Sequence, residues 1–117
     1  ECRMPFIHTR VNRPISKETE KTLAAAFGDA ISLLPGKSEQ WLMLQFEENC
    51  RLYFQGQDAC PMAFVKVQVY GSASAEAYDA LTGRISSLLE QYLLIRPDHV
   101  YVSYEENGHW GWNGNNF

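Results

Sequence analysis

A proline directly after a methionine is the residue of this chain best suited to chemistry. The sequence opens Glu1-Cys2-Arg3-Met4-Pro5, and Met4 is a potential initiator. If Met4 is removed, the Pro5 nitrogen changes from a tertiary amide into a secondary amine, which can act as a base. Burial among apolar groups lowers the pKa of such an amine toward neutrality, where a general base works well. The alternative is a proline that begins a strand and has no chemical role.

The segment that follows Pro5 has the alternation of a β-strand. One set is Phe6, His8 and Arg10, and the other is Ile7, Thr9 and Val11. Asn12-Arg13-Pro14 ends this strand, and Ser16 can cap a helix. Apolar residues at helical spacing predict that the helix runs to Leu34, before Pro35-Gly36. A second strand is predicted over residues 41–46, which alternate in polarity.

The pattern then restarts at an offset of 58 residues. The offset carries Met4 onto Met62, Phe6 onto Phe64, Ser16 onto Ser74 and Leu23 onto Leu81. This internal duplication predicts a third strand over residues 62–69, a second helix that ends before Pro97, and a fourth strand over residues 100–104. A short edge strand at residues 52–54 is a further expectation.

Two strand–helix–strand units predict an α/β fold with one four-stranded mixed sheet and two antiparallel helices on one face. The other face carries polar side chains mixed with Phe6, Trp41 and Met43. Edge strands and this mixed face predict oligomers around a wet central space. The alternative is a solvated sheet face, which is common.

The chain ends in Gly108-His109-Trp110-Gly111-Trp112-Asn113-Gly114-Asn115-Asn116-Phe117. Its Asn and Gly content is typical of a loose tail. Large aromatic side chains gain most from burial, however, so we expect Trp110, Trp112 and Phe117 to dock on the same or a neighbouring subunit.

Length and charge limit the classes of protein. The 117 residues fit one domain, which we place at residues 5–117, with halves 5–46 and 62–104 and a C-terminal segment 105–117. We interpret residues 1–4 as a leader, either an expression remnant or an unprocessed N-terminus. A net charge of −4 without basic clusters predicts no nucleic-acid partner. No apolar run is long enough to span a bilayer, so we expect no membrane insertion.

Three cysteines without metal-ligand spacing predict neither a disulfide framework nor a zinc site, and we expect no metal and no cofactor. They favour a reducing, cytoplasmic setting. Secretion without a signal peptide is the alternative.

Four short motifs together carry a family resemblance. They are Met4-Pro5-Phe6-Ile7, Gly36-Lys37, Pro97-Asp98-His99-Val100-Tyr101 and Gly111-Trp112-Asn113. In this order the chain resembles the macrophage migration inhibitory factor and D-dopachrome tautomerase family of the tautomerase superfamily, from Pro5 to Phe117. The resemblance implies a homotrimer of duplicated strand–helix–strand units. It also implies an isomerase, active on phenylpyruvate-like 2-oxo acids, whose N-terminal proline is the general base.

The resemblance assigns further site residues. Lys37 would bind the substrate carboxylate as a point charge, and the backbone amide of Tyr70 would contact the same group. Tyr101 would come from an adjacent subunit. Near it, Ser103 stands where the relative has Asn and reaches less far into the pocket. The apolar walls would be Phe6, Trp110, Trp112 and Phe117.

Each assignment has a structural alternative. Lys37 could be an ordinary cation near a helix C-terminus, Tyr101 a packing residue, and the tryptophans a seal at a subunit boundary. The Cys-x-x-Cys stretch of the cytokine is replaced by Met62-Ala63-Phe64-Val65, so its proposed thiol oxidoreductase activity is not expected.

Two functions of different class remain open. The first is the phenylpyruvate tautomerase, inactive while residues precede Pro5. The second is a cytokine-like trimer that binds a cell-surface receptor and keeps a vestigial catalytic pocket.

Overall fold

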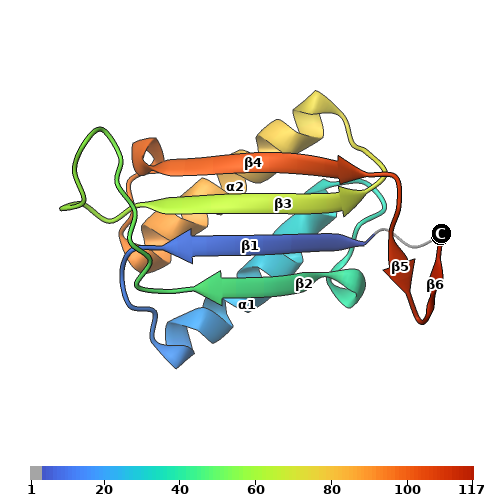
Figure 1. Ribbon diagram of the computed structural model, residues 1–117, viewed down its shortest axis with the longest axis horizontal. Helices are drawn as coiled ribbons and strands as arrows, with labels where there is room; N and C mark the ends of the chain where they lie inside the picture. The colour runs from blue at the N-terminus through green and yellow to red at the C-terminus, as the bar shows by residue number, and fades with distance from the viewer. Residues whose placement is uncertain (1–3) are drawn as a thin grey trace.

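The computed structural model describes residues 4–117 as a four-stranded sheet with two helices on one face (Figure 1). The strands are β1 (Pro5–Val11), β2 (Met43–Glu47), β3 (Ala63–Tyr70) and β4 (Val100–Asn107). They lie in the order β2-β1-β3-β4, with β1 parallel to β2, β3 parallel to β4, and β1 antiparallel to β3. This arrangement confirms the predicted mixed α/β fold. Residues 1–3 of the leader expected from the sequence lie outside the described residues.

Both helices begin at the predicted serine caps. The helices are α1 (Lys17–Ala30) and α2 (Ala75–Leu93). The Ser16 hydroxyl accepts a hydrogen bond from the Thr19 amide at 3.1 Å, and the Ser74 hydroxyl accepts one from the Ala77 amide at 3.1 Å. Each bond satisfies an amide that has no partner within its helix. The caps therefore fix where each helix starts over the sheet.

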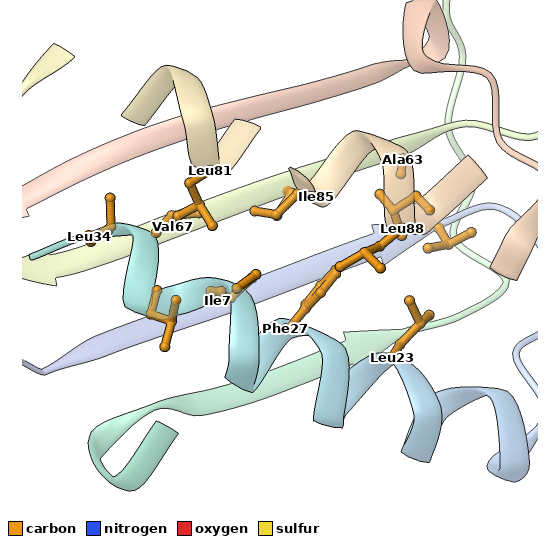
Figure 2. Close-up of a cluster of buried hydrophobic side chains, with 14 of the residues drawn as sticks. Ile7, Leu23, Phe27, Leu34, Ala63, Val67, Leu81, Ile85 and Leu88 are labelled. Atoms are coloured by element: carbon orange, nitrogen blue, oxygen red, sulfur yellow. The ribbon is translucent and has the colours of Figure 1, made fainter. Parts of the chain in front are cut away.

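The hydrophobic core lies between the helices and the sheet. Figure 2 shows Leu23 and Phe27 of α1 and Ile85 of α2 pointing toward Ile7 and Val67 of the sheet. All five side chains are fully buried. Burying such a side chain contributes about 1.5–3 kcal/mol. This layer holds β1, and with it Pro5, in a fixed place.

The pairing of β1 with β3 shows the duplication in the backbone. Pro5 pairs with Val69, and His8 pairs with Lys66. His8 and Lys66 are also 58 positions apart, so each is the other's counterpart in the duplication. This central pair therefore lies where the two halves of the sheet meet. The halves are therefore related by an approximate twofold rotation. The short 3-10 helices repeat as well, since η2 (Glu39–Trp41) precedes β2 and η3 (Pro97–His99) precedes β4.

The second strand begins later than predicted. Trp41 belongs to η2, and β2 starts at Met43, so the prediction of Trp41 on the outer sheet face is wrong. Glu39, the first residue of η2, also contacts α1. A β-carbon at Gly28 would lie 2.6 Å from the Glu39 side chain, so the side chain of Glu39 occupies the space that the missing β-carbon leaves over α1.

Other boundaries also differ. The first helix ends at Ala30, and a 3-10 turn, η1 (Ile31–Leu33), follows it. The expected edge strand at residues 52–54 is a single bridge between Phe54 and Gln57. The C-terminal segment forms a hairpin of two short strands, β5 (Gly111–Trp112) and β6 (Asn115–Asn116).

The two ends of the sheet carry different segments. Figure 1 shows the start of β1 beside the β5–β6 hairpin at one end, and the loop between β2 and β3 at the other end. Among the described residues no helix is long and apolar enough to cross a membrane.

Candidate active site

Pro5 is the first residue of β1 and is buried. This position suits a proline, which has no amide proton to donate to a sheet. A cavity of about 710 Å³ opens beside Pro5 and its neighbour Phe6. Because Met4 precedes Pro5 in this chain, the Pro5 nitrogen is an amide nitrogen and has no basic lone pair.

The walls of this cavity, called the Pro5 cavity below, are mostly apolar. They are formed by Met4, Pro5, Phe6, Gln40, Trp41, Leu42, Met43, Gln68, Trp110, Gly111 and Trp112. The chain has three tryptophans, and all three line this one cavity. Two glutamines supply polar side chains at its edge. The cavity therefore suits a flat apolar group with a polar end.

The β5–β6 hairpin places two of the tryptophans. Its turn, Asn113-Gly114, has positive φ at both residues, 54° and 84°, as a two-residue hairpin turn requires. The ring of Trp112 meets Trp41 edge to face at 4.9 Å and 89°. The amide of Phe117 donates to the Trp110 carbonyl at 3.0 Å. The aromatic tail thus contacts its own subunit through Trp112, one of the two expected alternatives, while Trp112 and Phe117 each remain 47% exposed.

Phe117 itself lies beside Tyr70 and not among the residues that line the Pro5 cavity. The two ring centroids are 5.5 Å apart. Phe117 therefore packs against the Tyr70 ring and does not form a wall of the Pro5 cavity.

Lys37 is buried, with 5% of its surface exposed. It follows Gly36, whose φ of 80° turns the chain after the first helical segment, and its amide donates to the Leu34 carbonyl at 3.0 Å. Lys37 lies outside the last turn of α1, which has no basic residue. Together with Tyr70 and Gly71 it lines a second hollow, of about 390 Å³.

Met4 lines the Pro5 cavity and is hydrogen-bonded to the backbone of Tyr70, which lines the second hollow. Its side chain is 4% exposed and lines the Pro5 cavity. Its carbonyl accepts a hydrogen bond of 3.2 Å from the Tyr70 amide. The amide that the family resemblance assigns to the substrate carboxylate is thus engaged by Met4. Pro5 thus lines the first of these two cavities and Lys37 lines the second.

A polar network holds the loop that follows Tyr70. The Tyr78 hydroxyl donates to Glu106 at 2.6 Å and accepts from the Ala73 amide at 3.1 Å. Burial and the hydrogen bond to the Glu106 carboxylate, with the charge of that group, raise the pKa of Tyr78 to about 12. Tyr78 therefore stays neutral and fixes the loop from α2 and β4.

Tyr101 and Ser103 lie away from the Pro5 cavity of their own chain. Tyr101 pairs with Phe64, whereas Pro5 pairs with Val69. Five residues of strand separate these positions, which is about 17 Å. Tyr101 is 58% exposed on the sheet face opposite the helices. Within one chain, the structure does not bring Tyr101 or Ser103 to Pro5.

Among the lining residues that were not assigned to the site from the sequence are Gln40, Leu42, Met43 and Gln68. Met43 and Gln68 are the two register partners of Phe6. The alternation of the strands places them on the same face as Phe6, so the strand pairing is the signal that could have found them. Gln40 and Leu42 lie in and after η2, which the sequence pattern did not reveal. No three His, Cys, Asp or Glu side chains within residues 4–117 are grouped as a metal site would need.

The fold and the cavity define a class of small α/β protein. Two strand–helix–strand units form one sheet, and a proline opens the first strand beside an aromatic cavity. A family model described as macrophage migration inhibitory factor (MIF) matches residues 4–117. The chain belongs to the MIF family.

Solved structures agree with this family. MIF2 of Leishmania major is 32% identical, with a TM-score of 0.90 over 97% of each chain. A MIF-like protein of Entamoeba histolytica is 23% identical, with a TM-score of 0.86 over 97% of this chain and 99% of that chain. Pt0534, in its structure inactivated by 2-oxo-3-pentynoate, is 18% identical, with a TM-score of 0.82 over 93% of each chain. The last two show the fold alone. No curated protein matches the chain.

Proposed function

We propose that the protein is a keto–enol tautomerase of phenylpyruvate-like 2-oxo acids and that its base is Pro5 as an N-terminal amine. The observation that carries the proposal is the place of Pro5, which is buried at the start of β1 beside a cavity lined by all three tryptophans of a MIF-family chain. The cavity volume of about 710 Å³ leaves room for an aromatic ring. A protein of the same fold is inactivated by a 2-oxo acid, 2-oxo-3-pentynoate.

The chemistry follows from the state of the Pro5 nitrogen. With Met4 removed, it is a secondary amine surrounded by apolar side chains, which favour its neutral form. The neutral amine takes a proton from the carbon next to the substrate carbonyl, and the electron pair of that bond moves to form an enolate oxygen. Return of the proton to this oxygen gives the enol, and the reverse steps give the keto form. Both directions conserve atoms and charge.

Removal of Met4 would also free the carboxylate-binding groups. The Tyr70 amide loses its bond to the Met4 carbonyl and can donate to the substrate carboxylate. Lys37, on the same hollow as Tyr70, supplies a positive charge for that group. Without Met4, the Pro5 cavity and the hollow of Lys37 and Tyr70 would become one continuous site.

The remaining groups would come from a neighbouring subunit of a homotrimer. Tyr101 is exposed on the open sheet face, about 17 Å along the sheet from its own Pro5. That placement suits a residue that serves the Pro5 cavity of another subunit, with Ser103 beside it.

The direct test is the rate at which the phenylpyruvate enol absorbance disappears. Protein whose intact mass shows that it begins at Pro5 is compared with protein that retains Met4. We expect activity in the first and none above background in the second. Equal activity in both samples would overturn the role of the free amine.

Pro5→Gly, in protein that begins at residue 5, is the matched control. This variant keeps a primary amine at the same place but lacks the pyrrolidine ring that makes the Pro5 nitrogen a secondary amine. A positioned base contributes about a hundredfold to ten-thousandfold in rate, so we expect a loss in this range. Near-full activity of Pro5→Gly would exclude the mechanism.

A cytokine-like trimer with a vestigial pocket is the second candidate function. The observation that favours it is the engagement of the Tyr70 amide by Met4, which closes the carboxylate site in a chain that keeps Met4. Receptor binding that tolerates Pro5→Gly, without turnover in protein that begins at Pro5, would support this function.

A further inference from the structure

The loop between β2 and β3 contains a turn that copies the C-terminal hairpin. Its bridge joins Phe54 to Gln57, and the amides and carbonyls of these two residues bond reciprocally at 2.9 and 3.2 Å. The turn residues Gln55 and Gly56 have positive φ, 56° and 77°. The offset of 58 residues carries this turn onto Asn113-Gly114. The twofold relation of the halves therefore makes Phe54 the counterpart of Trp112.

The aromatic contacts are copied too. Trp112 meets Trp41 edge to face at the Pro5 cavity. Phe54 meets His99, the counterpart of Trp41, at 5.6 Å and 73°. Phe54 also meets Tyr101 at 5.2 Å and 82°. Where the first half leaves a cavity of about 710 Å³, the second leaves about 80 Å³ beside Phe54 and Tyr101.

Hydrogen bonds hold this loop in place. The Gln57 side-chain oxygen accepts from the Ala59 amide at 2.6 Å and the Cys60 amide at 3.2 Å. The Asn12 side chain donates to the Cys60 carbonyl at 2.9 Å and accepts from the Met62 amide at 2.8 Å. The side chain that meets Tyr101 is thus carried by a fixed loop.

We propose that Phe54 is a positioning residue that fixes the Tyr101 ring for the Pro5 cavity of a neighbouring subunit. The inference rests on the proposed tautomerase and its trimer. Tyr101 is held edge-on by Phe54 on one side and by Phe64, at 6.3 Å and 84°, on another. Without Phe54, Tyr101 keeps one of these contacts and can rotate, so substrate binding at the neighbouring cavity weakens.

Steady-state kinetics of Phe54→Ala, in protein that begins at Pro5, test this role. An edge-to-face ring pair is worth enough to change binding about threefold to tenfold, so we expect KM to rise by this factor and kcat to change less than twofold. Phe54→Tyr, which keeps the ring, should retain the wild-type KM. Tyr53→Ala is the matched control, since it removes an exposed ring from the same loop.

A purely structural role would have a different result. It would lower the thermal midpoint and the fraction of active protein while KM stayed the same. Phe54→Leu keeps apolar volume but lacks the ring, so it tests the same role if the alanine variant does not fold. An unchanged KM in both variants, with an active wild type, overturns the role of Phe54 alone. An inactive wild type overturns the proposed function.

Mixed trimers show whether the effect crosses a subunit boundary. Subunits carrying Phe54→Ala are co-expressed with Pro5→Gly subunits under two different tags and purified through both. Only the Phe54→Ala subunits of such a trimer keep Pro5. At some of their active sites, Tyr101 comes from a neighbouring Pro5→Gly subunit, in which Phe54 is intact. We expect a fraction of activity with the wild-type KM. A KM equal to that of the Phe54→Ala trimer would place the effect within one chain and overturn the proposal.

Discussion

Thr9 offers a sharp test of the core that holds Pro5. Its side chain is fully buried on β1, and its hydroxyl oxygen has no hydrogen-bond partner among the described residues. An unsatisfied buried hydroxyl costs about 1–3 kcal/mol. Thr9→Val keeps the branched shape that suits a strand and replaces the hydroxyl with a methyl group.

The expected gain can be worked out from these terms. Removing the unsatisfied group recovers about 1–3 kcal/mol, and burying the new methyl adds about 0.8 kcal/mol. The slightly larger group meets Val65 and Phe46, the register partners of Thr9, and overpacking takes back about 1 kcal/mol or more. We expect Thr9→Val to raise the free energy of unfolding by about 1–2 kcal/mol. The thermal midpoint should rise by roughly 4–8 °C.

The measurement is urea unfolding at one fixed protein concentration, because oligomers unfold in a concentration-dependent way. Thr22→Val is the matched control, since Thr22 is exposed on α1, and it should change stability by no more than about 0.5 kcal/mol. Thr9→Ser, which keeps the hydroxyl and loses the methyl, should destabilise by about 1 kcal/mol. A destabilised Thr9→Val would refute the reasoning, since it would mean that the hydroxyl is satisfied in solution.

Burial and the Glu106 carboxylate raise the pKa of Tyr78 from 10.0 to about 12. The stability that Tyr78 contributes is therefore complete below pH 10 and declines as the pH rises toward 12. In urea unfolding, the stability advantage of the wild type over Tyr78→Phe should shrink above pH 10. Trp112→Ala removes the edge-on contact with Trp41 and should weaken phenylpyruvate binding about threefold to tenfold, measured by calorimetry; unchanged affinity would contradict it. Phe27→Ala should cost about 3–5 kcal/mol, because Phe27 is fully buried in the core, and a loss below 1 kcal/mol in urea unfolding would show that the core can repack.

Local signals were enough for most of the fold. Ser16 and Ser74 marked both helix starts, and the offset of 58 residues predicted that the second half repeats the first. Alternation placed Ile7, Thr9 and Val11 on the helix side of β1. Helix caps and strand alternation are set by residues close together in the sequence, so the sequence pattern predicts them directly.

The site itself depended on contacts that no local pattern contains. Trp41 lies in η2 and not in the predicted strand, and Glu39 of η2 packs against Gly28 of α1. Lys37 follows the turn at Gly36, is buried, and lines the hollow beside Tyr70. Such contacts join residues far apart in the sequence, and their geometry is set by tertiary packing.

The twofold relation of the halves has a covalent limit. The counterpart of Pro5 is Ala63, at the start of β3. A polypeptide has one amino end, so only one of two equivalent strand starts can be a free amine, however the chain is processed. Two separate units would offer two such ends, and joining them into one chain removes one. The second strand start is then released from any need for a proline, and here Phe54 and Tyr101 narrow the space beside it to a cavity of about 80 Å³.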